Sequence, residues 1–269
     1  ENVILKEYDL NNAKNSILRE YSILKKLPCH TNIVSCPSIL NERTLIFKKT
    51  YPTDYRHFID NLIVSKTYFP IDYVLYVMKK MIDVGQHLRK NNILHLDYKT
   101  ENVCFSDDGC GEPILIDFGN AINMDEINTI GKARGTLQYM SPEILYGKSK
   151  NDEKTDIWSL GVFFLEILMN DLPWDNIPSL NTSKLYKILE AKNPYEYFQE
   201  LREKDDNDII KNLFSFMLNI EKDERHNFDD LKTYIDTIDI QNNFKKYTNL
   251  VSIIKRIKSM NDIRYSIDA

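Results

Sequence analysis

The stretch His95-Leu96-Asp97-Tyr98-Lys99-Thr100-Glu101-Asn102 decides the fold. It follows a long segment of helical periodicity and is expected to form a loop. The spacing of Asp97, Lys99 and Asn102 can place three polar groups around one reacting centre. An aspartate can accept the proton of an attacking hydroxyl, a lysine can neutralise phosphoryl oxygens, and an asparagine can bind Mg²⁺. The stretch therefore indicates phosphoryl-transfer chemistry.

A second stretch, Ile114-Leu115-Ile116-Asp117-Phe118-Gly119, reads as an apolar strand that ends in an acid and a glycine. Hard cations prefer carboxylate oxygen, and a glycine lets the backbone turn sharply. The preceding Ser106-Asp107-Asp108-Gly109 is expected to be a hairpin turn. Asp117 is thus a candidate metal ligand at the end of a strand.

In this order, and followed by Ser141-Pro142-Glu143, these stretches resemble the catalytic domain of eukaryotic-type protein kinases. Either pattern alone would be weak, because both occur by chance or at ordinary strand ends. The resemblance implies a serine/threonine protein kinase that uses ATP and Mg²⁺. It assigns catalytic roles to Asp97, Lys99 and Thr136, and metal binding to Asn102 and Asp117.

Cofactor-binding residues follow from the same resemblance. Lys6, in a segment similar to V-A-I-K, would reach the ATP phosphates and pair with Glu20. Phe47 would stand at the back of the adenine pocket, with residues 48–51 as the hinge. Without the other motifs, Lys6 and Glu20 would read as two solvated charges, and Phe47 remains hard to separate from an ordinary core residue.

Other residues of the resemblance are expected to be structural or to select the substrate. Asp156 would brace the catalytic loop, and Arg225 would pair with Glu143. Lys99 and Thr136 follow the serine/threonine pattern, so serine and threonine are the expected acceptors.

Glu101 and Glu166 stand where some relatives meet an arginine of the substrate. They favour a basic consensus only weakly, because the same acids occur in kinases without that preference.

The periodicity predicts an α+β protein with two unequal lobes. Residues 1–51 would form a partial small lobe with a sheet and one helix, residues 52–237 a large and mainly helical lobe, and residues 238–269 a helical tail. The expected strands are 2–6, 33–40 and 44–51, and the expected helices are 12–27, 71–91, 154–170, 183–190, 207–219 and 228–237, with loops at 92–153 and 171–182.

Composition limits the partners and the compartment. The net charge of -5 argues against a general nucleic-acid or anionic-membrane surface. The four cysteines lack zinc-ligand spacing and are expected to be reduced thiols. No apolar run of membrane-spanning length and no signal-peptide pattern is present. We expect a cytoplasmic or nuclear protein that is not secreted, and the kinase resemblance implies that it acts on protein substrates.

Three departures from the family pattern matter. No glycine precedes Gly85, so the Gly-rich loop over the ATP phosphates is absent from this chain, and ATP affinity should suffer. Because residue 1 is not Met, truncation is the simpler explanation. Leu96 replaces the arginine that reads an activation-segment phosphate, and Lys132 stands at the usual acceptor position, with Thr129 displaced from it. We expect an enzyme that does not require activation-loop phosphorylation.

Two alternatives remain. The missing Gly-rich strands would also suit a truncated pseudokinase or a kinase-fold module that binds another protein. A small-molecule kinase is less consistent with the segment from Gly135 to Glu143, which resembles a peptide-docking loop. A Gly-rich motif upstream of residue 1 would favour the enzyme.

Overall fold

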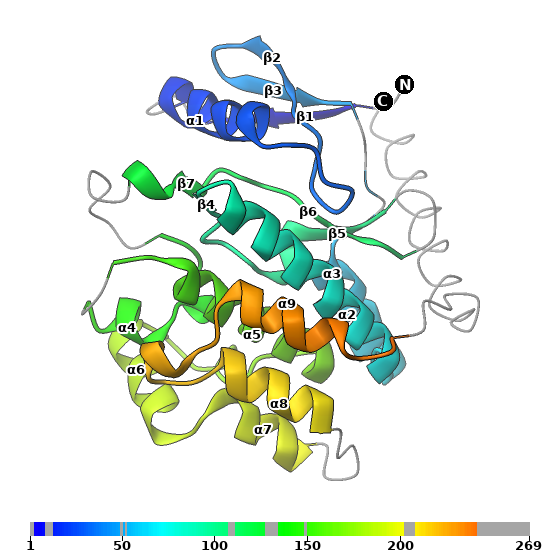
Figure 1. The fold of residues 1–269 in the computed structure, drawn as a ribbon, viewed down its shortest axis with the longest axis vertical. Helices are drawn as coiled ribbons and strands as arrows, with labels where there is room; N and C mark the ends of the chain where they lie inside the picture. The colour runs from blue at the N-terminus through cyan, green and yellow to red at the C-terminus, as the bar shows by residue number, and fades with distance from the viewer. Residues whose placement is uncertain are drawn as a thin grey trace.

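The computed structural model describes residues 3–8, 13–48, 51, 53–106, 111–126, 134–147, 150–201 and 208–240. A small sheet with one helix forms one end of the molecule, and a larger group of helices forms the rest (Figure 1). The predicted α+β fold with two unequal lobes is confirmed.

The sheet of the small lobe contains β1 (Ile4–Glu7), β2 (Ser38–Asn41) and β3 (Thr44–Phe47) in the antiparallel order β1-β3-β2. Strand β2 starts later than the predicted residue 33, because Pro37 has no N–H to donate to the ladder. The turn before β3 is closed by the Arg43 N–H, which donates to Asn41 Oδ1 at 2.8 Å.

Helix α1 (Ala13–Lys26) lies beside this sheet (Figure 1). Its apolar stripe buries Ile17 and Leu24, as the helical spacing predicted. Glu20 lies in the same stripe, three residues after Ile17, and its side chain is fully buried. A charged residue in an apolar stripe needs partners, and the candidate site supplies them.

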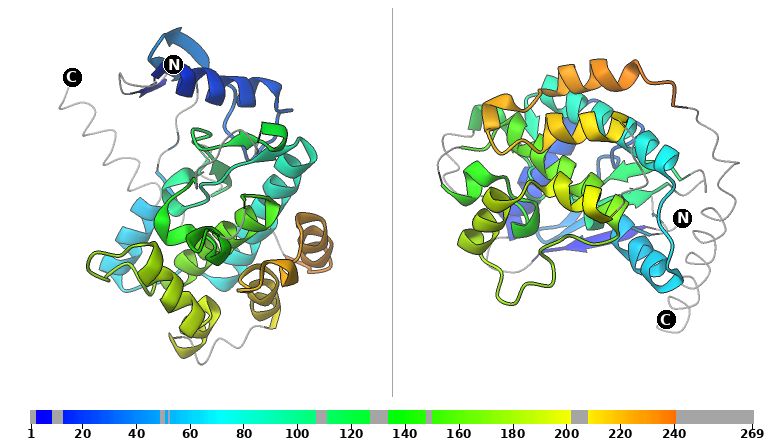
Figure 2. Two further views of the ribbon diagram at one scale, coloured as in Figure 1. Left: turned by 90° about the vertical axis from the view of Figure 1, so that its left-hand side faces the viewer. Right: turned by 90° about the horizontal axis from the view of Figure 1, so that it is seen from below.

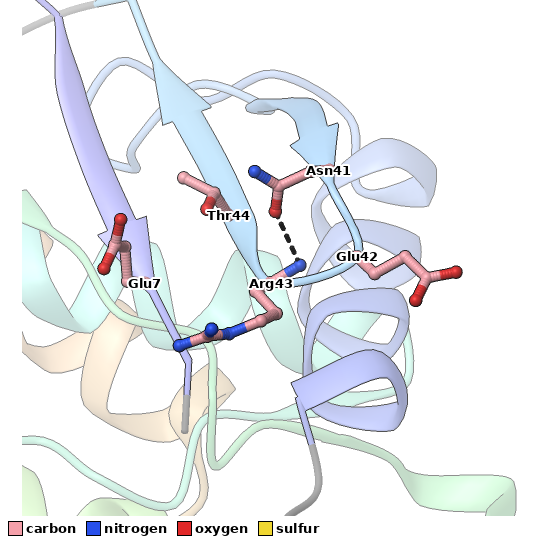
Figure 3. Close-up of a pocket in the computed structure, with 5 residues that line it drawn as sticks. All are labelled: Glu7, Asn41, Glu42, Arg43 and Thr44. Atoms are coloured by element: carbon pink, nitrogen blue, oxygen red, sulfur yellow. Dashed lines mark hydrogen bonds between the residues drawn. The ribbon is translucent and has the colours of Figure 1, made fainter. Parts of the chain in front are cut away.

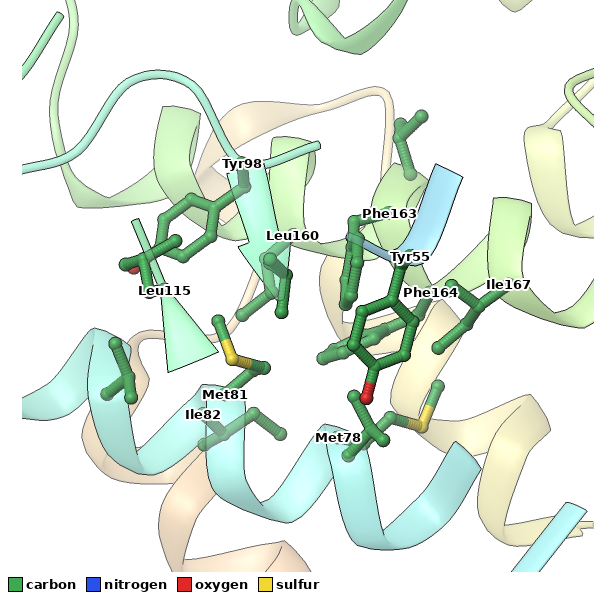
Figure 4. Packing of buried hydrophobic residues seen from close by; sticks show 14 of the residues in the cluster. Tyr55, Met78, Met81, Ile82, Tyr98, Leu115, Leu160, Phe163, Phe164 and Ile167 are labelled. Carbon is green, nitrogen blue, oxygen red and sulfur yellow. The ribbon is translucent and has the colours of Figure 1, made fainter. Parts of the chain in front are cut away.

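The large lobe is organised around α3 (Ile71–Lys90) and α5 (Glu153–Met169). Met78 and Met81 of α3 pack with Leu160 and Phe163 of α5 in the core (Figure 4). Helix α9 (Phe228–Asp236) lies along α3, with Phe228 against Gly85, where a Cβ would come within 2.1 Å of the ring (Figure 2). Around them lie α4 (Pro142–Leu145), α6 (Thr182–Ala191), α7 (Pro194–Leu201) and α8 (Asp208–Met217).

Several elements were missed by the periodicity. Helix α2 (Tyr55–Ser65) follows the small lobe and is capped by Asp54, whose Oδ1 accepts from the His57 N–H at 2.7 Å. The region predicted as a loop at 92–153 contains two short antiparallel pairs and the helix α4. The pairs are β4 (Ile93–Leu94) with β7 (Ile122–Asn123), and β5 (Val103–Phe105) with β6 (Pro113–Leu115).

The short strand pairs frame the two motifs of the sequence. Strand β4 leads into the loop that begins at His95, and β6 ends just before Asp117. Residues 107–109 of the predicted hairpin turn lie outside the described residues, as do residues 241–269 of the predicted tail. None of the described helices combines the length and apolar content needed to span a membrane.

Candidate active site

Asp97 is the centre of the catalytic loop, and both of its carboxylate oxygens are held. Its Oδ1 accepts from the Thr136 N–H at 3.1 Å and from the Thr136 hydroxyl at 2.8 Å. Its Oδ2 accepts from the Asn102 amide at 2.9 Å and from the Asn120 amide at 3.2 Å, while Lys99 Nζ lies 3.9 Å away. Three other predicted site residues, Lys99, Asn102 and Thr136, therefore meet at this carboxylate.

Asn120 was not predicted as part of this group. It follows Gly119 in the sequence but contacts Asp97, 23 residues earlier, so no local spacing signals its role. Asn102, by contrast, lies five residues after Asp97 in the same loop. Its amide also donates to the Asp97 carbonyl at 2.9 Å and closes the loop. This orientation leaves Asn102 Oδ1 available as an acceptor for a cation.

The backbone of the loop is held by Asp156 from α5. Its carboxylate accepts from the His95 N–H at 2.8 Å and from the Leu96 N–H at 2.7 Å, so the predicted bracing contact is present. Burial raises the pKa of Asp156 to about 7, although both N–H donors oppose the shift. Leu96 adopts a left-handed backbone with φ of 62°.

His95 lies under the loop with its ring edge against Phe118, at a centroid distance of 4.9 Å. Burial lowers the pKa of His95, which favours the neutral ring. Since the Asp97 N–H donates to Nδ1 at 3.3 Å, the proton lies on Nε2, which faces the Ile116 carbonyl. His95 thus links the loop to the backbone of Ile116, directly before Asp117.

Lys6, Glu20 and Asp117 form a chain of charges between the two lobes. Lys6 Nζ lies 2.7 Å from Glu20 Oε2 and 2.7 Å from Asp117 Oδ1. Burial raises the pKa of Asp117, but Lys6 and the Gly119 N–H outweigh it, and the net pKa lies below the ordinary value. Asp117 is therefore ionised, as a metal ligand must be.

The site offers oxygen ligands suited to a magnesium ion and a cation suited to the phosphates of a nucleotide. Asp117 presents a carboxylate that is 41% exposed, and Asn102 presents an amide oxygen. Mg²⁺ commonly takes one or two protein oxygens and fills its remaining positions with phosphate and water. Lys6 adds a cation that can face phosphate oxygens.

Residues 127–133 lie outside the described residues, and the segment that follows them reaches the site through Gly135 and Thr136. Gly135 has φ of 102°, and a Cβ there would come within 2.4 Å of the Leu96 carbonyl oxygen. Only glycine allows this approach, which places the Thr136 N–H and hydroxyl on Asp97. Lys132 and Thr129 lie outside the described residues.

Two ion pairs with buried carboxylates support the large lobe. Arg225 makes a two-pronged contact with Glu143 at 2.8 and 2.7 Å, as predicted. Glu166 is buried and accepts from Arg56 at 2.9 Å and from the Tyr139 hydroxyl. Burial raises the pKa of Glu166 to about 7, although Tyr139 and Arg56 oppose the shift. Glu166 is thus engaged within the protein, whereas Glu101 is exposed.

Phe47 ends β3 and is buried in the core cluster. Lys48 is exposed, and residues 49–50 of the predicted hinge lie outside the described residues. The roles of Phe47 and of the hinge toward adenine therefore stay predictions.

Comparison with known proteins agrees with this geometry. Two unequal lobes, with Lys6, Glu20 and Asp117 in contact and Asp97 held in a loop between β4 and β5, define a protein of the kinase class. The protein kinase domain model matches residues 2–234, and the chain belongs to that family.

Three similar proteins illustrate the relation. Calcium-dependent protein kinase 4 of Plasmodium berghei is 29% identical over 76% of this chain and 38% of its own length. The probable serine/threonine-protein kinase fhkC of Dictyostelium discoideum is 27% identical over 80% of this chain and 36% of its own. Cyclin-dependent kinase 2 of Caenorhabditis elegans is 29% identical over 70% and 50%. The chain thus spans well under half the length of the first two relatives.

Proposed function

We propose that this protein is a serine/threonine protein kinase that transfers the γ-phosphoryl group of Mg-ATP to protein hydroxyls. The observation that carries the proposal is the simultaneous presence of two groups of contacts: the ion pairs of Lys6 with Glu20 and Asp117, and the hydrogen bond of Thr136 to Asp97. The first arranges the cation and the metal ligand, and the second orients the proton acceptor.

Each residue has a defined task in this mechanism. Asp97 orients the acceptor hydroxyl and receives its proton, while Thr136 and Asn102 fix the direction of the carboxylate. Lys99 faces the same carboxylate and would neutralise the transferring group. Bound Mg²⁺, held by Asn102 and Asp117, would neutralise charge on the phosphates.

The wider setting is part of the same proposal. Cys29, Cys36 and Cys104 are free thiols, which suits a reducing compartment such as the cytoplasm or the nucleus. The acidic net charge favours protein substrates over nucleic acid or anionic membrane surfaces. Relatives named as serine/threonine kinases support the acceptor type.

The acceptor type is tested by phosphoamino-acid analysis of a mixed peptide library incubated with the full-length protein and labelled Mg-ATP. We expect phosphoserine and phosphothreonine and no phosphotyrosine, because Lys99 and Thr136 narrow the space beside Asp97. Mainly phosphotyrosine would overturn the assignment. If a folded full-length protein with an unaltered active site leaves all peptides unlabelled, a kinase-fold module that binds another protein is favoured instead.

A further inference from the structure

Tyr8 lies directly after strand β1, two residues beyond Lys6. Its N–H donates to the Arg43 carbonyl at 2.9 Å, and Arg43 Nε donates back to the Tyr8 carbonyl at 3.4 Å, so the backbone continues the ladder with β3. Alternate residues of a strand point to the same face. Lys6 and Tyr8 therefore share the face that meets Glu20, whereas the intervening Glu7 lines a shallow pocket with residues of the β2–β3 turn (Figure 3).

The hydroxyl of Tyr8 donates to Glu20 Oε2, the oxygen that also accepts from Lys6 at 2.7 Å. The other oxygen, Oε1, accepts from the Phe118 N–H at 3.3 Å. Glu20 is fully buried, so its charge depends on these three donors. Of these three donors, Lys6 is expected to face the nucleotide, and the Phe118 N–H lies beside Asp117. The Tyr8 hydroxyl is the third donor, and it serves Glu20 without either of these other roles.

Tyr8 also contacts Lys6 itself, whose Nζ lies 5.3 Å from the centroid of the ring. Burial and the negative charge of Glu20 both raise the pKa of Tyr8, so its hydroxyl stays protonated and keeps donating at neutral pH. Lys6 has three donors, of which two are directed at Glu20 and Asp117. If a bound phosphate takes one of the Lys6 hydrogen bonds away from Glu20, the hydrogen bond from the Tyr8 hydroxyl still holds Glu20.

We propose that Tyr8 is a positioning residue that holds Glu20, and through it helix α1 and Lys6, in the arrangement needed for catalysis. The inference rests on the proposed kinase function. The Tyr8 hydroxyl is a fixed tether within the small lobe. Such a tether suits this protein because Leu96 is apolar and buried, and has no group that could bind a phosphate on the activation segment.

The test compares Tyr8→Phe with Tyr21→Phe, each of which removes one hydroxyl. Tyr21 is a half-buried tyrosine of α1 whose hydroxyl makes no hydrogen bond within the described part of the chain. We expect Tyr8→Phe to lower kcat/KM for ATP about tenfold, equivalent to about 1.4 kcal/mol. The KM for the peptide should stay within twofold, and Tyr21→Phe should match the wild type in both.

A double-mutant cycle then asks whether Tyr8 acts through Glu20. The dissociation constant of Mg-ATP is measured for the wild type, Tyr8→Phe, Glu20→Ala and the double variant, since binding needs no turnover. Alanine leaves no acceptor for the Tyr8 hydroxyl, so we expect Tyr8→Phe to weaken binding several-fold in the wild-type background and less than twofold beside Glu20→Ala. Thermal denaturation of all four proteins verifies that each is folded.

The outcomes separate this inference from the proposed function. If the wild type phosphorylates peptides and Tyr8→Phe matches it as closely as Tyr21→Phe does, the positioning role is wrong and the kinase function stands. Equal effects of Tyr8→Phe in both backgrounds of the cycle would also overturn it, because Tyr8 would then act without Glu20. A wild type that binds Mg-ATP but transfers no phosphate contradicts the proposed function instead.

Discussion

Two residues beside the reacting centre adopt backbone conformations that side chains usually avoid. Leu96 has φ of 62° and Asp117 has φ of 58°. Asp156 holds the N–H of Leu96, while Lys6 and the Gly119 N–H hold the carboxylate of Asp117. Such strain persists only where surrounding contacts fix it, and here it directs the loop of Asp97 and the candidate metal ligand Asp117 toward one place.

Gly135 offers a residue-scale prediction with an internal control. Gly135→Ala should lower kcat for peptide phosphorylation by more than tenfold, because its Cβ would lie 2.4 Å from the Leu96 carbonyl oxygen and displace Thr136 from Asp97. The measurement is a steady-state assay beside thermal denaturation.

The matched control is Gly147→Ala, at a glycine that also has positive φ, 71°, but no atom within 4 Å of the added Cβ. It should lose about 1 kcal/mol of stability and keep its kcat within twofold. Equal kcat values for the two variants would mean that the approach of Gly135 to Leu96 does not position Thr136.

Residue types at fixed spacing predicted most of the candidate site. Asp97, Asn102 and Asp117 carry chemistry that few other residue types provide, so their pattern was readable from the sequence. Tyr8 and Asn120 were not predicted, because their importance lies in contacts with Glu20 and Asp97 that form only on folding.

At the scale of elements, long amphipathic helices were predictable and short elements were not. Helix α1 was expected at 12–27 and spans Ala13–Lys26, since Ile17 and Leu24 repeat at helical spacing. Strands of two or three residues such as β4 and β5 are too short to show alternation. These strands form where the backbone on either side of the Asp97 loop pairs with the backbone on either side of Asp117, through β4 with β7 and β5 with β6.

The apolar contact around Leu96 bears on regulation. Leu96 is buried with Leu94 of β4 and Ile122 of β7, and Met124 packs against them. Where family members that are switched by phosphorylation would carry a cation for phosphate, this protein joins the catalytic loop to the start of the activation segment by hydrophobic packing. That packing needs no phosphate.

We therefore predict that phosphatase treatment changes the activity of the full-length protein by less than about twofold, well below the ~1.4 kcal/mol of a tenfold effect. Thr129→Ala should behave likewise. Activity is measured with the same peptide before and after treatment, with loss of phosphate checked by mass spectrometry. A tenfold loss in either experiment would establish a phospho-switch in this segment.

For the whole molecule, α5 is the scaffold on which the lobe is built. Every residue of α5 from Thr155 to Leu168 is buried, so this part of the helix shows no exposed polar face. It supplies Asp156 to the catalytic loop at one end and Glu166 to the Arg56 contact near the other. Substitutions that disturb the packing of α5 should therefore also displace Asp156 and the catalytic loop that it holds.

The ion pair between Arg225 and Glu143 tests how much contacts with this scaffold contribute to the stability of the lobe. Arg225 is fully buried and stacks over Trp158 of α5, with its guanidinium carbon 4.9 Å from the ring. Arg225→Ala should lower the free energy of unfolding by about 3–5 kcal/mol, because Glu143 would lose its partner in a buried place. Chemical denaturation gives the value.

The control is Arg89→Ala, which removes a half-exposed arginine 3.3 Å from Glu153. It should change the free energy of unfolding by less than about 1 kcal/mol. Similar small losses in both variants would show that the Arg225 contact contributes little to the stability of the lobe.

We propose that phosphoryl transfer depends on Asp97 and Asp117, in a site that is already assembled. The most direct measurement is transfer of labelled phosphate from Mg-ATP to a serine peptide by the wild type, Asp97→Asn, Asp117→Asn and, as the control, Asp125→Asn at an exposed position of the same segment. We predict no transfer by Asp97→Asn with Mg-ATP binding retained, no transfer and weakened binding by Asp117→Asn, and wild-type transfer by Asp125→Asn. Wild-type rates in either of the first two variants would contradict the assignment of the active site.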